Sequence, residues 1–195
     1  MLPAMVSPGD WVLDVGANVG HYTLELSKLV GAQGRVIAFE PVPEAFEVLV
    51  ANSRLAPHRN ITLINAATSD TTRASGMVIP RYEDTGLDNL YLAHLSDGGA
   101  GLQVLCVTID SLALPVPIRF AKVDTEGHEL ATLRGMERLL RRDRPALVVE
   151  DNDREVYAFL AALGYQPEKV PGSSNTIFQY HAGVPTPERV NPRSR

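Results

Sequence analysis

Short apolar runs and helix-like repeats alternate through the first 67 residues of the chain. The run WVLDVG at residues 11–16 predicts a buried strand, and HYTLELSKLV at residues 21–30 has the apolar spacing of an amphipathic helix. The pattern repeats with the run RVIAFE, a helical segment that begins near Pro43, and the third run ITLINAA. Because such alternation places helices between neighbouring parallel strands, it predicts an α/β fold with a parallel sheet.

Residues 71–108 follow a different pattern. They have no helical period, and the β-type fragments SGMVIP, LDNLYLA and GLQVLCVTI are separated by Gly, Asp and Asn, including the turn Asp97-Gly98-Gly99. We therefore expect a β-rich, antiparallel insertion between the third and fourth strands of the sheet.

Regular alternation returns after this insertion. The runs PIRFAKVD and PALVVE predict two further buried strands. Each is followed by a segment with helical character, at residues 126–142 and 154–163. Residues 165–170 and 175–180 then predict a closing hairpin around Pro171-Gly172.

The size and charge of the chain bound its function. With 195 residues and a formal charge of -5, it suits one globular domain, which we expect at residues 1–180. A mobile, proline-containing tail is expected at residues 181–195. No block of Lys or Arg is longer than Arg141-Arg142, which argues against nucleic acid and against a membrane surface as partners. A small-molecule ligand fits this charge balance better.

Cysteine usage and the N-terminal residues indicate the location. Cys106 is the single cysteine and lies in an apolar run, where a small buried hydrophobic residue is expected. The first residues lack a basic leader followed by a long apolar segment, and no window approaches 18 uninterrupted apolar residues. We therefore expect a cytoplasmic protein.

The loop Gly16-Ala17-Asn18-Val19-Gly20 joins the first strand to the first helix. In an open parallel sheet ligands bind beyond the carboxyl ends of the strands, which is where this loop falls. Glycine allows a sharp bend and the close approach of a ligand, and free N–H groups at the helix start bind carboxylate and phosphate alike. The loop lacks the middle glycine of a dinucleotide site and the Lys-Thr or Lys-Ser pair of a phosphate-binding loop.

Two acidic residues flank this loop in the predicted topology. Asp14 precedes the glycines, and Glu40 ends the second strand, where a carboxylate is placed to accept hydrogen bonds from both hydroxyls of a ribose. Helix capping by Asp14 and a solvated strand end at Glu40 are the structural alternatives. Taken together, the loop and the acids favour an adenosine ligand whose charged part is an amino acid, with S-adenosyl-methionine as the natural candidate.

Four stretches carry a family resemblance. DVGANVGHYT, AFEPVPEAF, KVDTEGHELATLRG and PALVVE occur in the order found in the FkbM family of S-adenosyl-methionine-dependent methyltransferases, which the chain resembles over roughly residues 9–180. The resemblance implies a Rossmann-like class I methyltransferase fold. This is a three-layer αβα sandwich with a mostly parallel seven-stranded sheet and an antiparallel last strand. The cofactor contacts expected from it are Asp14, Gly16, Ala17, Asn18, Gly20, Glu40 and Pro41.

The reacting end of the site is expected after the fourth strand. Asp124 lies at its tip, where it could position an acceptor hydroxyl or take its proton, and His128 is a second candidate base. A surface position is the favoured alternative for His128, and capping of the next helix is favoured for Glu129. Lys122 is expected to pair with an acid inside the sheet.

A metal site is possible but not favoured. Asp124, Asp151 and Asn152 resemble the oxygen ligands with which catechol-type O-methyltransferases hold a divalent ion, and such ligands suit magnesium. Asp151-Asn152 fits equally well as a cap of the helix near Arg154, which we favour. Methyl transfer needs alignment and removal of water, and no metal in principle.

The resemblance therefore implies an enzyme that methylates a hydroxyl of a small metabolite or sugar. A nicotinamide-dependent oxidoreductase on the same plan is disfavoured by the glycine spacing, and a non-catalytic nucleoside-binding relative is the other alternative. Family members commonly have a longer segment before the glycine-rich strand, whereas ten residues precede Trp11 here. The insertion, a second subunit in a homo-oligomer, or residues upstream of the given start could complete the acceptor pocket.

Overall fold

The computed structural model describes residues 2–83, 85–96, 101–150 and 153–182. The expected turn at Asp97-Gly98-Gly99, the residues Asp151 and Asn152, and nearly all of the expected tail lie outside these ranges.

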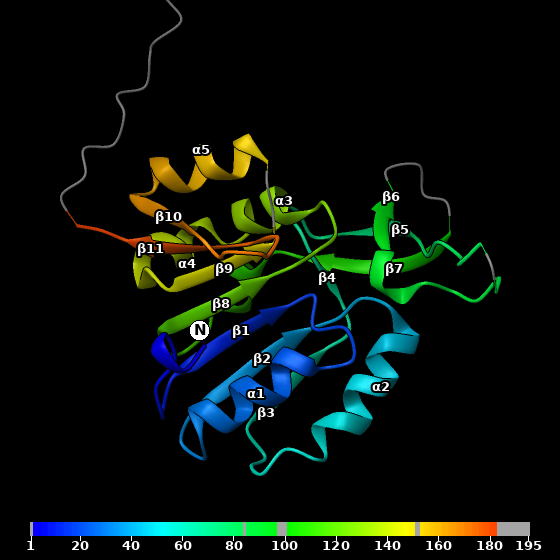
Figure 1. The fold of residues 1–195 in the computed structure, drawn as a ribbon, viewed down its shortest axis with the longest axis horizontal. Helices are drawn as coiled ribbons and strands as arrows, with labels where there is room; N and C mark the ends of the chain where they lie inside the picture. Colours follow the sequence, from blue (N-terminus) through cyan, green and yellow to red (C-terminus); the bar gives the residue numbers. More distant parts are fainter. Residues whose placement is uncertain (1, 84, 97–100, 151–152, 183–195) are drawn as a thin grey trace, which may run out of the picture.

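A seven-stranded sheet forms the centre of the molecule (Figure 1). Its strands are β1 (Trp11–Val15), β2 (Arg35–Phe39), β3 (Ile61–Ile64), β8 (Ile118–Val123), β9 (Ala146–Glu150), β10 (Tyr165–Lys169) and β11 (Asn175–Tyr180). Their order is β10-β11-β9-β8-β1-β2-β3, and β11 runs antiparallel to both of its neighbours. The pairs β1–β2, β2–β3, β1–β8 and β8–β9 are parallel. This topology confirms the predicted Rossmann-like class I sheet with its antiparallel last strand.

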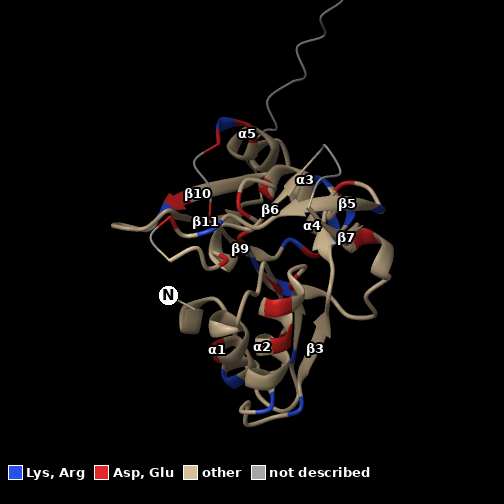
Figure 2. Ribbon diagram, turned by 90° about the vertical axis from the view of Figure 1, so that its right-hand side faces the viewer, with Lys and Arg blue, Asp and Glu red and all other residues tan. Residues whose placement is uncertain are grey.

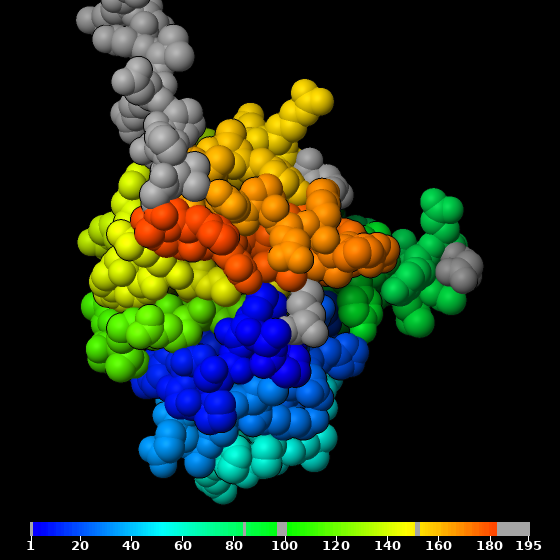
Figure 3. Space-filling model, turned by 60° about the vertical axis from the view of Figure 1, so that its left-hand side comes forward, coloured from blue at the N-terminus to red at the C-terminus, as the bar shows by residue number. Residues whose placement is uncertain are grey.

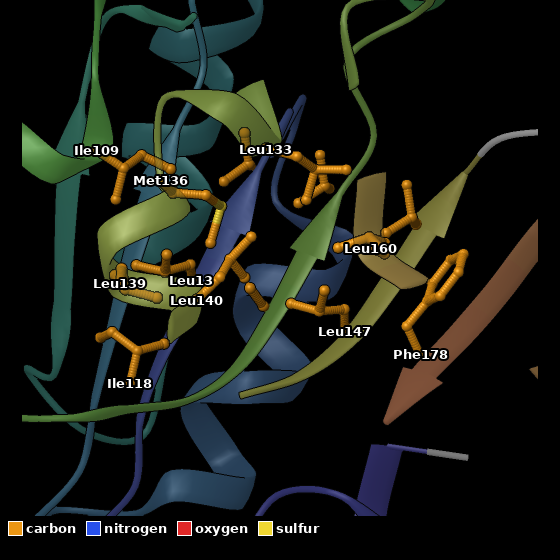
Figure 4. Packing of buried hydrophobic residues seen from close by; sticks show 14 of the residues in the cluster. Leu13, Ile109, Ile118, Leu133, Met136, Leu139, Leu140, Leu147, Leu160 and Phe178 are labelled. Atoms are coloured by element: carbon orange, nitrogen blue, oxygen red, sulfur yellow. The ribbon is translucent and has the colours of Figure 1, made fainter. Parts of the chain in front are cut away.

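Helices cover both faces of this sheet because successive strand residues point in opposite directions. Val12, Val36 and Phe120 pack with α1 (His21–Val30) on one face, where α2 (Pro43–Ser53) also lies. Leu13 and Leu147 point to the other face, toward α3 (Glu129–Arg134), α4 (Glu137–Asp143) and α5 (Arg154–Ala162). Figure 4 shows this second, larger core, in which the helices contribute leucines and Met136. The result is the expected three-layer arrangement.

The helix predicted at residues 126–142 is divided into α3 and α4. Gly135 lies at the break between them, and a side chain there would overlap the main-chain oxygen of Ser69, which follows β4 of the second sheet. The Asp110 carboxylate then accepts hydrogen bonds from the main-chain N–H groups of Arg138 and Leu139, at 2.8 and 3.0 Å. These contacts cap the N-terminus of α4, because the first N–H groups of a helix have no partner within the helix.

The segment between β3 and β8 builds a second, four-stranded sheet. Its strands β4 (Ala67–Thr68), β5 (Arg73–Val78), β6 (His94–Ser96) and β7 (Leu102–Val107) lie in the order β4-β7-β5-β6. Pairing is antiparallel except between β4 and β7. Figure 1 shows this sheet beyond the carboxyl ends of β1, β2 and β8, so it stands at the edge of the main sheet where ligands bind in such folds.

One β-type fragment of this segment is wrongly predicted. LDNLYLA forms the short 3-10 helix η2 (Leu90–Leu92) rather than a strand. The Asn89 side chain accepts a hydrogen bond from the main-chain N–H of Tyr91, and this cap stabilises a helical turn. The other short helices are η1 (Leu2–Ala4) and η3 (Ile109–Leu112).

The N-terminal residues pack across the sheet. Leu2, Met5 and Val6 contact the core that contains Val148 and Ile177, and Figure 3 shows this segment between the β10–β11 hairpin and the region of α1. Acidic and basic residues are interspersed over most elements (Figure 2). Among the residues that the structure describes, none belongs to a helix both long and apolar enough to cross a bilayer.

Candidate functional site

A pocket opens where the carboxyl ends of the main strands meet the second sheet; we call it the strand-end pocket. Residues 15–19 at the end of β1, Glu40 and Pro41 after β2, Ala66 after β3, and residues 124–126 with His128 after β8 line one side. The other side is lined by Ala67, Thr68, Met77 and Leu95 of the second sheet and by Leu90, Tyr91 and Ala93 in and after η2. The expected residues Gly16, Ala17, Asn18, Glu40, Pro41, Asp124 and His128 therefore share one cavity, and Asp14 and Gly20 do not line it.

The two glycines of the first loop make room for protein atoms. Gly16 has a φ of 75°, and a side chain there would overlap the main-chain oxygen of Asp124, so β1 and β8 approach closely at their ends. Gly20 has a φ of 95°, and a side chain there would press on Leu49 of α2. The lack of a side chain at Gly20 thus allows close packing between α1 and α2, and the cofactor contact expected there stays a prediction.

Glu40 is held in place by two main-chain donors. Its Oε2 accepts a hydrogen bond from the N–H of Asn18 and its Oε1 one from the N–H of Val42, both at 2.8 Å. Only 5% of Glu40 is exposed, and burial raises the pKa of its carboxyl. Each carboxylate oxygen has a second acceptor position. A ligand hydroxyl in the strand-end pocket could therefore still bond to Glu40.

Asp14 is fully buried below the pocket. One of its oxygens accepts a hydrogen bond from the Thr23 hydroxyl, and the other, Oδ1, has no hydrogen-bond partner. Burial raises the pKa of this carboxyl. Direct contact with a cofactor was expected for Asp14, but its side chain points into the protein because β1 is covered by α1 at this position.

Lys122 and Asp124 form an ion pair at the edge of the pocket. The Lys122 Nζ lies 2.8 Å from the Asp124 Oδ2 and 4.7 Å from the ring centroid of Tyr22. Burial alone would lower the pKa of Lys122, but the charges of Asp14 and Asp124 outweigh it, so that pKa is raised. This pairing confirms the expectation that the Lys122 ammonium is paired to an acid.

The loop after Asp124 is fixed by Glu129. The Glu129 Oε1 accepts hydrogen bonds from the main-chain N–H groups of Thr125 and Gly127, at 2.8 and 3.2 Å. This is the capping role favoured for Glu129 from the sequence. Between these two hydrogen bonds Glu126 adopts a left-handed backbone conformation, with a φ of 51°, and lines the pocket. Burial raises the pKa of the Glu126 carboxyl.

His128 lies at the start of α3 and lines the pocket. Its Nε2 is 3.0 Å from the hydroxyl oxygen of Ser69, a residue that is fully buried. The imidazole therefore lies between α3 and the start of the second sheet. The sequence had favoured a position on the protein surface instead. A proton acceptor at this place would face the same cavity as Asp124.

A family model for the methyltransferase FkbM domain matches residues 14–167. The chain belongs to the FkbM methyltransferase family. Hexuronic acid methyltransferase AglP of Haloferax volcanii is 30% identical over 136 residues, which are 68% of this chain and 52% of that protein. The present chain spans about half the length of this curated relative.

Solved structures share the fold of this FkbM domain. Methyltransferase FkbM from Methylobacillus flagellatus KT has a TM-score of 0.62 and 18% identity, over 88% of this chain and 43% of that one. Fibrillarin from Aeropyrum pernix, solved with natively bound S-adenosyl-L-methionine, has a TM-score of 0.55 and 16% identity, over 90% and 68%.

The competing oxidoreductase hypothesis finds no support in this FkbM domain. Tyr165 and Lys169 have the Tyr-x-x-x-Lys spacing used by some such enzymes, but both lie on β10 and neither lines the strand-end pocket. The Tyr165 side chain is 2% exposed and its hydroxyl donates to the main-chain oxygen of Leu140 at 3.4 Å.

The sequence offered the insertion as one way to complete the pocket, but it identified none of the individual residues on the second-sheet side. Residues 66–68 could have been found from topology alone, because they follow β3 at the ligand-binding edge. Met77, Leu90, Tyr91 and Leu95 carry no such signal, since apolar residues in a β-rich segment predict burial and not a ligand. Among the described residues, no group of three or more His, Cys, Asp or Glu side chains could hold a metal ion.

Proposed function

We propose that the chain is an S-adenosyl-methionine-dependent methyltransferase that methylates a hydroxyl of a small metabolite or sugar. The observation that carries this proposal is the presence of Glu40 and Asp124 in one pocket. Family membership supports methyl transfer, and the bound S-adenosyl-L-methionine of the fibrillarin structure supports the cofactor. The hexuronic acid named for the Haloferax volcanii relative supports a sugar acceptor.

The cofactor side of the pocket fits an adenosine with an amino acid attached. Glu40 would bond the ribose hydroxyls, and residues 16–18 with Pro41 would border the rest of the molecule. The carboxylates of Glu40, Asp124 and Glu126 line the pocket, and their negative charge suits a cationic sulfonium. When bound, the sulfonium supplies a methyl group already activated for displacement.

The residues after β8 would serve the acceptor. As the acceptor oxygen forms its bond to the methyl carbon, the carbon–sulfur bond breaks and the hydroxyl proton must leave. Asp124 would hold that hydroxyl and accept the proton, and His128, which lines the same pocket, would be the second candidate base. The pocket walls would exclude water from the reacting atoms.

Two measurements test this function. Isothermal titration with S-adenosyl-methionine and with NAD should give binding of the first and none of the second; failure to bind S-adenosyl-methionine would refute the proposal. Release of S-adenosyl-homocysteine should then be followed over a panel of sugars, uronic acids and small alcohols. A protein that binds the cofactor but methylates none of them would be a non-catalytic relative. Turnover that persists in excess chelator would exclude a metal requirement.

A further inference from the structure

Three charged side chains form a column between the interior of the sheet and the strand-end pocket. Asp14 on β1 lies directly opposite Lys122 on β8 in the parallel register. Asp124 follows Lys122 by two residues, so it continues on the same side of the chain toward the pocket. We call Asp14, Lys122 and Asp124 the charge column.

The charge column is buried at its base and open at its top. Asp14 is fully buried, the Lys122 side chain is 4% exposed, and the Asp124 side chain is 23% exposed. The Lys122 ammonium contacts the Asp124 Oδ2 at 2.8 Å and the Tyr22 ring at 4.7 Å. Lys122 thus lines the pocket with little exposure of its own, and its ammonium lies against the Asp124 carboxylate and the Tyr22 ring.

Stability alone does not explain a lysine at this position. The neighbouring residues on the same face of the sheet, Val12, Val36, Phe120 and Val148, are apolar and fully buried. Apolar residues of similar volume often replace buried ion pairs without loss of stability, because taking charges out of water offsets their mutual attraction. A buried ammonium here points to a requirement on the group that it holds.

The surroundings make Lys122 the main opposing charge for several acids. Among the described residues that line the pocket, it is the single Lys or Arg. Its charge opposes those of Asp14, Glu40, Asp124, Glu126 and Glu150. Asp124 also interacts with Glu150 at the end of β9, so without Lys122 two carboxyl groups would face each other at the pocket edge.

We propose that Lys122 is a positioning residue of the methyl-transfer site, which holds the Asp124 carboxylate at the pocket edge while Asp14 balances the buried ammonium from below. The proposal rests on the proposed function in one respect, because it takes Asp124 to serve the acceptor. Lys122 itself acts through Asp124.

Lys122→Met tests this role, with Lys28→Met as the matched control on an exposed lysine of α1. Lys122→Met should lower kcat by about 30-fold or more, with the Kd for S-adenosyl-methionine and the KM for the acceptor within about threefold of wild type. Lys122→Arg should recover a large part of kcat, because a guanidinium also binds a carboxylate. The control should match wild type.

A double-mutant cycle separates positioning from general stability. In an Asp124→Asn background, Lys122→Met should cost less than about threefold in kcat, because the group through which it acts is already lost. Equal losses in both backgrounds, or a kcat within about threefold of wild type in the single variant, would overturn the proposal. If Lys122→Met does not fold, Lys122→Gln takes its place, and failure of both to fold assigns the lysine to stability and also overturns it.

A structural readout keeps this test apart from that of the function. Crystal structures of wild type and Lys122→Met should show the Asp124 carboxylate at the pocket edge in the first and displaced in the second. An unmoved carboxylate would refute the positioning role. If the wild-type protein binds no S-adenosyl-methionine, the proposed function is refuted instead. The two crystal structures would still decide whether Lys122 holds the Asp124 carboxylate at the pocket edge.

Discussion

The two sides of the strand-end pocket are built in different ways. On the main-sheet side, Glu40, Lys122 and Asp124 are charged, largely buried, and fixed by main-chain donors or by one another. On the second-sheet side, Leu90, Tyr91 and Leu95 are apolar or aromatic, and Tyr91 is 55% exposed. The first side offers fixed polar partners, which we propose are used by the ribose of the cofactor at Glu40 and by the acceptor hydroxyl at Asp124. The second side offers apolar contact, which we propose is used by the body of the acceptor.

The largest effect is expected at the bend of the first loop. Gly16→Ala should destabilise the fold by about 3 kcal/mol or more, because the added carbon overlaps the main-chain oxygen of Asp124 and the φ of 75° is unfavourable for alanine. Urea denaturation gives this free energy of unfolding. Gly9→Ala is the control, since Gly9 has a similar φ of 93° with no atom within 4 Å of an added carbon. Equal losses in both variants would mean that the close approach of β1 and β8 contributes nothing.

The acceptor role of Asp124 gives the next largest effect. Asp124→Asn should lower kcat by about 100-fold or more, because the amide cannot accept the hydroxyl proton, while S-adenosyl-methionine binds nearly as before. Steady-state kinetics and isothermal titration measure the two quantities separately. A parallel loss of turnover and cofactor affinity would place Asp124 on the cofactor side of the comparison.

Glu40 provides the matching experiment on the cofactor. Glu40→Ala should weaken S-adenosyl-methionine binding by about 1 to 3 kcal/mol, roughly 5- to 150-fold in Kd, because a charged acceptor for the ribose hydroxyls is lost. Glu40→Gln keeps one acceptor oxygen and should lose less. Wild-type affinity in Glu40→Ala would contradict the proposed ribose contact.

The fold and the pocket residues at the ends of the main strands could be predicted from the sequence for the same reason. Strand and helix periods fix which residues end a parallel strand, and those ends meet at one edge of the sheet. Gly16, Glu40 and Asp124 each end or follow such a strand, so their meeting in one pocket follows from local patterns. The four motifs added the family, and with it the antiparallel position of β11.

The remaining features depend on contacts between residues distant in sequence. Ser69 approaches Gly135 closely at the break between α3 and α4, and Leu49 approaches Gly20 in the same way. Asp14 faces α1 rather than the pocket, which follows from its strand register and the position of Thr23. No pattern within a single segment contains these pairings, and for the same reason the apolar residues of the second sheet could not be recognised as pocket walls.

The smallest effect is expected on the second-sheet side, at Tyr91. Because Tyr91 lines the pocket and is more than half exposed, Tyr91→Ala should raise the KM for the acceptor by about 3- to 10-fold, through loss of a partly buried aromatic contact. Tyr91→Phe should keep most of that contact. Tyr82→Ala removes an exposed tyrosine of the same segment that does not line the pocket, and it should leave KM unchanged. Tyr91→Ala could instead weaken the binding of S-adenosyl-methionine and leave the KM for the acceptor unchanged. In that case the residues around Tyr91 border the cofactor, and the assignment of this side of the pocket to the acceptor is wrong.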